Sequence, residues 1–180
     1  MTSDTSQTGT RAGFVAVIGA PNAGKSTLVN RLTGSKVSIV TQKVQTTRFP
    51  VRGIVMDGQT QMVLVDTPGI FNPRRRLDRA MVASAWEGAE EADAVVHLVD
   101  TSAQMAIGEG KGSPADRRSV EDVETIIQAL KGRDSKAILA LNKIDGLKRE
   151  SMLAVMTELF NTGVYSDVFL ISAATGDGVL

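Results

Sequence analysis

The sequence contains no cysteine and a single histidine, His97. The missing thiols exclude disulfides, zinc–thiolate sites and cysteine nucleophiles, and one imidazole cannot build a histidine-rich metal site. No apolar run approaches the roughly 20 residues that a membrane-spanning helix needs. Lysine plus arginine (20) equals aspartate plus glutamate (20), so the chain lacks the basic excess that is typical of nucleic-acid-binding proteins.

The composition is that of a soluble globular domain, with 42% hydrophobic and 22% charged residues. A length of 180 residues suits one α/β domain and is short for two. Residues 1–12 are polar and have no apolar core, so they are neither a signal peptide nor a membrane anchor. We therefore predict a disordered leader over 1–12, a single domain over 13–180 and a cytoplasmic location.

Short apolar runs alternate with helical patterns, which predicts an α/β fold with a mostly parallel sheet of about six strands and helices on both faces. The pair Asp57-Gly58 predicts a hairpin that places one antiparallel strand at the sheet edge. The expected strands are 14–18, 49–56, 60–66, 94–100, 136–141 and 167–171, and the expected helices are 25–32, 77–91, 120–130 and 150–160. Leu77, Met81, Ala85 and Ala89 share one face of the second helix. Residues 35–48 and 101–118 are predicted to be loops, the second long and exposed because it is rich in Gly, Ser, Pro and charge.

A glycine-rich stretch follows the first strand directly and opens the first helix. It fits the phosphate-loop pattern G-x-x-x-x-G-K-[ST] and consists of Gly19, Ala20, Pro21, Asn22, Ala23, Gly24, Lys25 and Ser26, with Thr27 next. Glycines at both ends let successive N–H groups point at phosphate oxygens, and the helix N-terminus adds partial positive charge. Lys25 can reach the β- and γ-phosphates, and the Ser26 hydroxyl can ligate Mg²⁺. A chance glycine-rich turn is the alternative interpretation, and the motif alone indicates only a nucleoside triphosphate.

A candidate base-reading segment follows the strand at 136–141 and consists of Asn142, Lys143, Ile144 and Asp145. The Asp145 carboxylate can accept hydrogen bonds from guanine N1–H and the 2-amino group, whereas adenine would leave it desolvated and unpaired. Asn142 can bridge the loop and the base while the Lys143 stem covers the ring. A helix-capping aspartate beside a solvated lysine is the alternative. Ser172-Ala173, after the last strand, offers a backbone N–H to guanine O6, a weak signal by itself.

Two further segments are candidates for sensing the γ-phosphate. One ends the strand at 60–66 and consists of Asp66, Thr67, Pro68 and Gly69. Asp66 would hold Mg²⁺ through a water and the Gly69 N–H would face the γ-phosphate, although T-P-G also forms plain turns. The other is Gln45-Thr46-Thr47-Arg48, in which one hydroxyl, preferably that of Thr47, could complete the Mg²⁺ shell only with GTP bound. GTP would then order this loop and hydrolysis would release it.

In their order along the chain, these five segments resemble those of the Ras-like GTPases. They are residues 19–26, 45–48, 66–69, 142–145 and 172–173. Three segments resemble the corresponding sequences of the bacterial Era-type branch: residues 19–30 (GAPNAGKSTLVN), 37–48 (VSIVTQKVQTTR) and 65–71 (VDTPGIF). The similarity runs from about Phe14 to the C-terminus. It implies a six-stranded sheet with five helices, GTP or GDP with Mg²⁺ as ligands, and hydrolysis of GTP to GDP and phosphate.

The resemblance also implies partners. Era-type proteins carry a KH-type RNA-binding domain after the GTPase domain and bind near the 3′ end of 16S rRNA during assembly of the 30S ribosomal subunit. Here the sequence stops at Leu180, where a last helix, beginning within 177–180, and the KH domain are expected. We therefore expect a fragment of a longer protein, and rRNA binding cannot be assigned to these residues. The resemblance further implies a monomer and peripheral association with the inner membrane.

Ile70 stands where many Ras-like proteins carry a glutamine that orients the attacking water, and its side chain cannot hydrogen-bond water. The resemblance implies that Asn22 instead helps to hold a potassium ion, which would offset charge between the β- and γ-phosphates. We thus predict catalytic roles for Lys25, Asn22, Thr47 and Gly69, and metal ligation by Ser26, Thr47 and Asp66. Ile70 completes the predicted nucleotide-binding set. Arg48 is a weaker catalytic candidate.

Several other residues and functions remain as alternatives. His97 is interpreted as a satisfied sheet residue rather than a base, Trp86 as core packing, and residues 74–76 (RRR) as a solvated face rather than a phosphate or RNA contact. A P-loop ATPase or small-molecule kinase, a non-hydrolysing GTP-binding scaffold and a GTPase of a related family compete with the leading interpretation. The N-K-I-D segment argues against the kinase, whereas Ile70 favours the scaffold.

Overall fold

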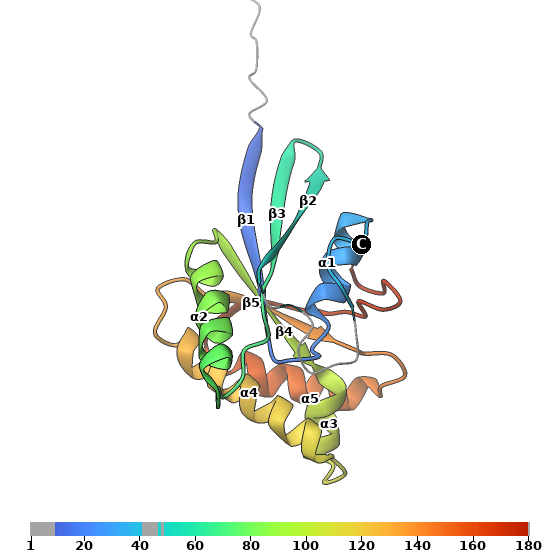
Figure 1. Ribbon diagram of the computed structural model, residues 1–180. Helices are drawn as coiled ribbons and strands as arrows, with labels where there is room; N and C mark the ends of the chain where they lie inside the picture. Colours follow the sequence, from blue (N-terminus) through green and yellow to red (C-terminus); the bar gives the residue numbers. More distant parts are fainter. Residues whose placement is uncertain (1–9, 41–46, 48, 180) are drawn as a thin grey trace, which may run out of the picture.

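The computed structural model describes residues 10–40, 47 and 49–179, which form a six-stranded sheet with five helices (Figure 1). The strands are β1 (Arg11–Ile18), β2 (Val51–Asp57), β3 (Thr60–Asp66), β4 (Ala94–Asp100), β5 (Ala137–Asn142) and β6 (Tyr165–Leu170). The helices are α1 (Lys25–Thr33), α2 (Arg76–Glu90), α3 (Thr101–Gly108), α4 (Pro114–Leu130) and α5 (Arg149–Phe160). None of the helices within the described residues has the length and apolarity needed to cross a bilayer.

The strand order is β2-β3-β1-β4-β5-β6, and only β2 runs antiparallel to its neighbour. The β2–β3 hairpin turns at Gly58, whose φ of 55° is a conformation that glycine adopts without strain. Figure 1 shows the hairpin and the start of β1 extending as a ribbon beyond the helices. The predicted α/β fold with one antiparallel edge strand is confirmed.

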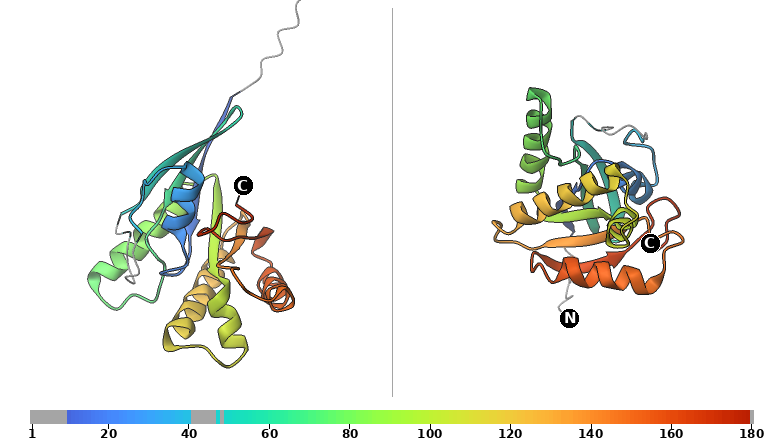
Figure 2. Two further views of the ribbon diagram at one scale, coloured as in Figure 1. Left: turned by 90° about the vertical axis from the view of Figure 1, so that its right-hand side faces the viewer. Right: turned by 90° about the horizontal axis from the view of Figure 1, so that it is seen from below.

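Helices cover the two faces of the sheet unequally. Residues of α2, α4 and α5 pack with Ala16, Ile18 and Val99 in the larger core cluster. On the opposite face α1 contributes Leu28 and Val29 to a smaller cluster. Figure 2 shows α1 on a different side of the sheet from α4. The alternation of side chains along each strand accounts for this division, because neighbouring residues point to opposite faces.

Parallel strands bring their carboxyl ends to one edge of the sheet, where the predicted motifs lie. Asp66 is the last residue of β3 and pairs with Val17 of β1. Asp100 and Asn142 end β4 and β5 and are partners in the ladder. The loops that follow these strands are therefore neighbours although they are far apart in the sequence.

Three expectations were wrong. The leader ends before residue 11, because Arg11 and Ala12 already pair with β3. The segment 101–118 is not a loop: Asp100 caps α3, and Ser113 with Pro114 begins α4 through a capping box with Asp116. Leu77 is 59% exposed, although its predicted partners Met81, Ala85 and Ala89 are buried.

Most remaining boundaries shift by one or two residues, as expected for element ends. The described residues of 177–180, where a helix was expected to begin, form a turn over 177–179. His97 is fully buried in β4 with its Nδ1 2.8 Å from the Tyr165 hydroxyl, and burial lowers its pKa to about 3. It is a buried sheet residue, as predicted, but it is not fully satisfied, because its Nε2 has no hydrogen-bond partner among the described residues. Trp86 packs against the larger core cluster, also as predicted.

Candidate functional site

The phosphate loop connects β1 to α1 and is packed too closely for side chains at its glycines. A Cβ on Gly19 would lie 2.4 Å from the Leu98 carbonyl oxygen. A Cβ on Gly24 would lie 2.3 Å from the Asn142 amide nitrogen, and Gly24 also has a φ of 101°. Glycine is therefore required at both ends of the loop.

Lys25 is buried beneath this loop, with 7% of its surface exposed. Its ammonium donates to the carbonyl oxygens of Gly19 (3.1 Å) and Ala20 (2.9 Å). Burial lowers its pKa to about 8, against the opposing influence of the Asp66 and Asp122 charges. The ammonium is positioned at the loop that would hold phosphates, and an incoming anion would stabilise its charge.

Three oxygen-bearing side chains from different segments converge beside Lys25. Ser26 Oγ of α1 donates to Asp66 Oδ2 at 2.7 Å, and Thr47 Oγ1 donates to the same oxygen at 3.1 Å. The two hydroxyl oxygens are themselves 3.1 Å apart. Asp66 is fully buried, and its second oxygen, Oδ1, has no hydrogen-bond partner among the described residues.

This arrangement fits a magnesium ion. Mg²⁺ takes oxygen ligands and commonly uses only one or two carboxylates together with phosphate oxygens and waters. The unpaired buried Oδ1 of Asp66 offers an acceptor for a metal-bound water. Ser26, Thr47 and Asp66 are the three residues predicted as ligands, and the structure brings them together. The predictions for Gln45, Thr46 and Arg48 lie outside the described residues.

The segment Asp66–Gly69 is held against β1 at its start and against the phosphate loop at its end. The Thr67 hydroxyl donates to the Val17 carbonyl at 2.8 Å, which fixes the start of the segment against β1. A Cβ on Gly69 would lie 3.0 Å from Pro21, so the two loops are in close contact. Pro68, between Thr67 and Gly69, has its carbonyl 3.3 Å from the Thr67 hydroxyl.

Ile70 occupies a different position from the one expected of a nucleotide-binding residue. Its side chain is 1% exposed and belongs to the larger core cluster. Its N–H donates to the Gly19 carbonyl at 3.0 Å. The side chain therefore packs in the core, and only the backbone of Ile70 contacts the phosphate loop.

The base-reading segment is organised by Asn142, which is 2% exposed. Its amide nitrogen donates to the Ala23 carbonyl (2.8 Å), and its amide oxygen accepts from the Ala173 N–H (2.8 Å). One side chain thus joins the phosphate loop to the loop after β6. Ser172-Ala173 was predicted to offer a backbone N–H to guanine O6. Both N–H groups already have protein acceptors, the Asp177 carbonyl for Ser172 and Asn142 Oδ1 for Ala173, so a base at this loop would share one of them.

Asp145 and Lys143 are each held by a neighbour. The Ser172 hydroxyl donates to Asp145 Oδ1 at 2.7 Å, which leaves Asp145 Oδ2 for another donor. Lys143 has a positive φ of 62°, and its ammonium lies 2.5 Å from Asp100 Oδ2. Ile144, between them, is half-buried.

Sequence reasoning missed three side chains at this site. Asp100 pairs with Lys143 and also caps α3 through the Ala103 N–H. Asn30 holds the segment after α1: its amide accepts from the N–H groups of Val37 and Ser38 and donates to the Ser38 carbonyl. Arg31 contacts the loop after β6. The Arg31 and Asp100–Lys143 contacts join residues far apart in the sequence, and the Asn30 contacts follow no motif used in the sequence analysis.

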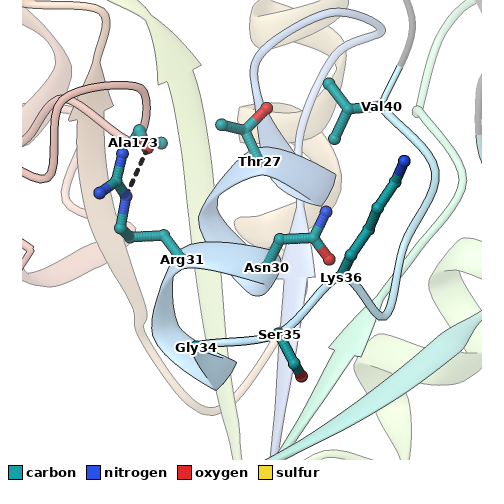
Figure 3. A pocket seen from close by; sticks show the side chains of 8 residues that line it. All are labelled: Thr27, Asn30, Arg31, Gly34, Ser35, Lys36, Val40 and Ala173. Atoms are coloured by element: carbon teal, nitrogen blue, oxygen red, sulfur yellow. Dashed lines mark hydrogen bonds between the residues drawn. The ribbon is translucent and has the colours of Figure 1, made fainter.

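Two hollows flank the site. One, of about 440 Å³, lies between α1, the segment after it and Ala173, and Figure 3 shows Thr27, Asn30 and Lys36 around it. The other, of about 450 Å³, lies between Asn22, the exposed Arg74 and α4. In it Asp122 accepts from the Asn72 N–H at 3.3 Å, and burial raises the pKa of Asp122 to about 6.

Both the family model and the curated relatives that match this chain are GTPases. Residues 14–143 match the family model described as "50S ribosome-binding GTPase". The chain is 68% identical over 179 residues to GTPase Era of Caulobacter vibrioides, covering 99% of this chain and 56% of that protein. It is 58% identical over 174 residues to GTPase Era of Maricaulis maris, covering 97% and 55%. The chain thus spans a little more than half the length of the curated relatives it matches.

Solved structures show the same similarity. Era in complex with MgGDPNP and nucleotides 1506–1542 of 16S ribosomal RNA aligns with a TM-score of 0.76 at 32% identity, over 94% of this chain and 53% of that one. An Aquifex aeolicus Era variant bound to GDP.AlF4⁻ aligns with a TM-score of 0.75 at 32% identity, over 93% and 53%.

Proposed function

Because this chain belongs to the Era family of GTPases, we propose that it binds GTP and GDP with Mg²⁺ and hydrolyses GTP to GDP and phosphate. The observation that carries the proposal is the convergence of Ser26, Thr47 and Asp66 on one point beside the buried ammonium of Lys25. A P-loop nucleotide site needs this combination, because the cation and the lysine together neutralise the phosphate charge. The Era structures with MgGDPNP and with GDP.AlF4⁻ support it by similarity.

Each segment has a distinct role in the proposed reaction. The phosphate loop 19–26 cradles the phosphates, with Thr27 following in α1, and Lys25 moves its hydrogen bonds from the loop carbonyls to phosphate oxygens. Ser26 and Thr47 ligate Mg²⁺ directly, whereas Asp66 holds a metal-bound water. The Gly69 N–H faces the γ-phosphate, so loss of that group releases Gly69 and Thr47 together.

Guanine is selected by Asp145, whose carboxylate is held by Ser172 and accepts from N1–H and the 2-amino group. An adenine base would leave that carboxylate without donors, and such a mismatch is strongly disfavoured. Asn142 keeps this reader in register with the phosphate loop. This role argues against the ATPase and kinase alternatives.

Ile70 cannot orient the attacking water, since its side chain is apolar and lies in the core, so hydrolysis needs another source of transition-state stabilisation. Asn22 is exposed on the phosphate loop with a φ of 61°, where its side chain is free to meet a cation from solvent. We assign it to a potassium ion that stabilises charge between the β- and γ-phosphates. Equal GTPase rates in sodium and potassium would contradict this assignment.

The direct test of the proposed function is GTP hydrolysis by this chain, followed as phosphate release with Mg²⁺ and with EDTA. We expect slow hydrolysis that requires Mg²⁺ and falls by at least about 100-fold in Ser26→Ala, which loses a direct metal ligand. Ser151→Ala, at a half-buried position of α5, is the matched control and should keep the parent rate. GDP binding without any hydrolysis would instead favour the scaffold alternative.

The proposed biological role rests on the curated Era relatives, of whose length this chain spans a little more than half. The Era relatives and the Era complex with 16S ribosomal RNA support a role in small-subunit assembly and 16S rRNA maturation for the full-length protein. Because this chain has zero net charge, we expect it to bind RNA weakly and in a strongly salt-dependent manner. A monomeric state, a cytoplasmic location and peripheral association with the inner membrane stay predictions.

A further inference from the structure

Arg31 projects from the last turn of α1 toward the loop that follows β6. Its Nε donates to the Ala173 carbonyl at 3.2 Å, and its Nη2 donates to the Ala174 carbonyl. A Cβ added to Gly176 would lie 3.3 Å from Nη1, so the guanidinium is in close contact with that residue. Figure 3 shows the side chain directed at Ala173 at the edge of the hollow. One planar, charged group therefore braces two consecutive peptide units.

The rest of this loop is held by other bonds. The Ser172 N–H donates to the Asp177 carbonyl, and the Gly176 N–H donates to the Ser172 carbonyl, both at 2.8 Å. The Ser172 hydroxyl also accepts from the Thr175 N–H while it donates to Asp145. The end of the loop that supports Asp145 is thus fixed without Arg31. The peptide unit between Ala173 and Ala174 depends on Arg31 for its carbonyl.

A trans peptide points its C=O and its N–H in opposite directions. Fixing the Ala173 carbonyl on Arg31 therefore directs the Ala174 N–H away from α1. The neighbouring Ala173 N–H is fixed in the same way by Asn142. A positive charge on the carbonyl side also polarises the peptide and strengthens its N–H as a donor.

From these contacts we infer that Arg31 is a positioning residue for guanine O6. It holds the 173–174 peptide in the orientation that presents a backbone N–H to the base, and it does so without touching the nucleotide. The inference rests on the proposed function and deepens it: Asp145 reads the N1 and 2-amino side of guanine, and the Arg31-braced loop reads the O6 side. Without Arg31 the peptide is free to flip, so only a fraction of the molecules present the donor.

The test compares three nucleotides that separate the two sides of the base. GDP carries O6, N1–H and the 2-amino group, and IDP keeps O6 and N1–H but lacks the 2-amino group. The 2-aminopurine riboside diphosphate keeps the 2-amino group but has neither O6 nor N1–H, so each variant is compared with the parent for the same nucleotide. If the competent loop population in Arg31→Ala falls to about a tenth, GDP and IDP both bind about tenfold more weakly. The 2-aminopurine nucleotide should change by less than about twofold, since no O6 is present to be read.

Two further variants make the result specific. Arg31→Lys keeps the charge but not the planar fork, so it should restore part of the affinity for GDP and IDP. Arg117→Ala removes an exposed arginine from α4 and should leave all three affinities unchanged. Thermal unfolding without nucleotide checks that each variant is folded.

The outcomes are distinguishable. An equal loss for all three nucleotides in folded Arg31→Ala, or no loss for any, would overturn the inference while leaving the proposed function in place. If the parent chain itself binds GDP no better than ADP, the proposed function fails and the inference fails with it. A loss confined to the two nucleotides that carry O6, partly restored by Arg31→Lys, would establish it.

Discussion

Asn142 is a buried amide whose two ends hold two different loops. Its nitrogen donates to Ala23 in the phosphate loop, and its oxygen accepts from Ala173 after β6. Phosphate binding and base binding therefore meet in one side chain. The predicted role of Asn142 as a bridge between loop and base has a structural counterpart here, in which the bridge runs between two loops.

Replacing Asn142 by alanine should damage both stability and binding. The buried Ala23 carbonyl and Ala173 N–H would each lose a partner, which should lower the free energy of unfolding by about 2 kcal/mol or more. GDP affinity should also fall, and by more than a smaller folded fraction accounts for, because neither loop is held in position. Urea unfolding and GDP titration measure the two effects. Asn161→Ala, exposed at the end of α5, is the control; comparable losses there would contradict the argument.

Lys25 gives the site a predictable pH dependence. Its pKa in the protein without nucleotide is lowered from 10.5 to about 8 by burial, and phosphate groups would raise it again. The complex therefore binds more protons than the free protein once the pH reaches this pKa. By linkage, affinity must fall as pH rises through that range and be level below it.

We expect GDP affinity to decrease between about pH 7 and pH 8.5, with uptake of a fraction of a proton on binding at the higher pH. Calorimetry at pH 8.5 in two buffers of different ionisation enthalpy measures that uptake. Lys36→Ala, which removes an exposed lysine near the site, should leave the profile unchanged. A level affinity together with no proton uptake would show that Lys25 is fully protonated in the free protein.

At the scale of elements, Asp100 links the end of β4 to both α3 and the base-reading segment. It caps α3 through the Ala103 N–H (3.2 Å) and pairs with the Lys143 ammonium (2.5 Å). Asparagine is as good an N-cap as aspartate but carries no charge. The two roles of Asp100 can therefore be separated by substitution.

Asp100→Asn should retain the stability of the parent and weaken GDP binding severalfold, because Lys143 loses the group that positions it. Asp100→Ala should weaken binding similarly and in addition lower the free energy of unfolding by about 1 kcal/mol, since the cap is lost. Thermal unfolding and GDP titration of both variants provide the comparison. Unchanged GDP binding by Asp100→Asn would contradict the positioning role of Asp100 toward Lys143.

The region around α3 also shows where sequence patterns are insufficient. Residues 101–118 contain the glycines, serine and proline that favour a loop, yet α3 packs against both α4 and α5 and buries Thr101, Ala103 and Met105. Small side chains on a short helix between two others give no clear amphipathic stripe. The central strands, by contrast, were predictable because strands of a parallel sheet are buried on both faces and read as short, nearly continuous apolar runs.

Sequence patterns were also insufficient to predict part of the candidate site. The segments at the strand ends were predictable because their residue types and spacings follow from phosphate, metal and base chemistry. Asn30, Arg31 and Asp100 were not, because each acts on groups brought near by the fold. Arg31, for example, reaches a carbonyl 142 residues away in the sequence.

At the scale of the whole molecule, the sheet places five loops at one edge and distributes its helices unequally between two faces. Phe169 lies between Val168 and Leu170, which pack in the larger cluster, so it points to the face that α1 covers and is 53% exposed. The described part of the chain thus contains a candidate nucleotide site assembled from the carboxyl ends of β1, β3, β4, β5 and β6, the loops that follow them, and Thr47 before β2. Whether that site selects guanine is the claim on which the account depends.

The measurement that tests this claim most directly is calorimetric titration of GDP and ADP in parallel with Mg²⁺, using the parent chain and Asp145→Asn. We predict that GDP binds at least about 1,000-fold more tightly than ADP, because adenine leaves the Asp145 carboxylate unpaired. We also predict that Asp145→Asn loses most of the GDP affinity while remaining folded. Comparable binding of GDP and ADP by the parent chain would contradict the account and favour a P-loop ATPase.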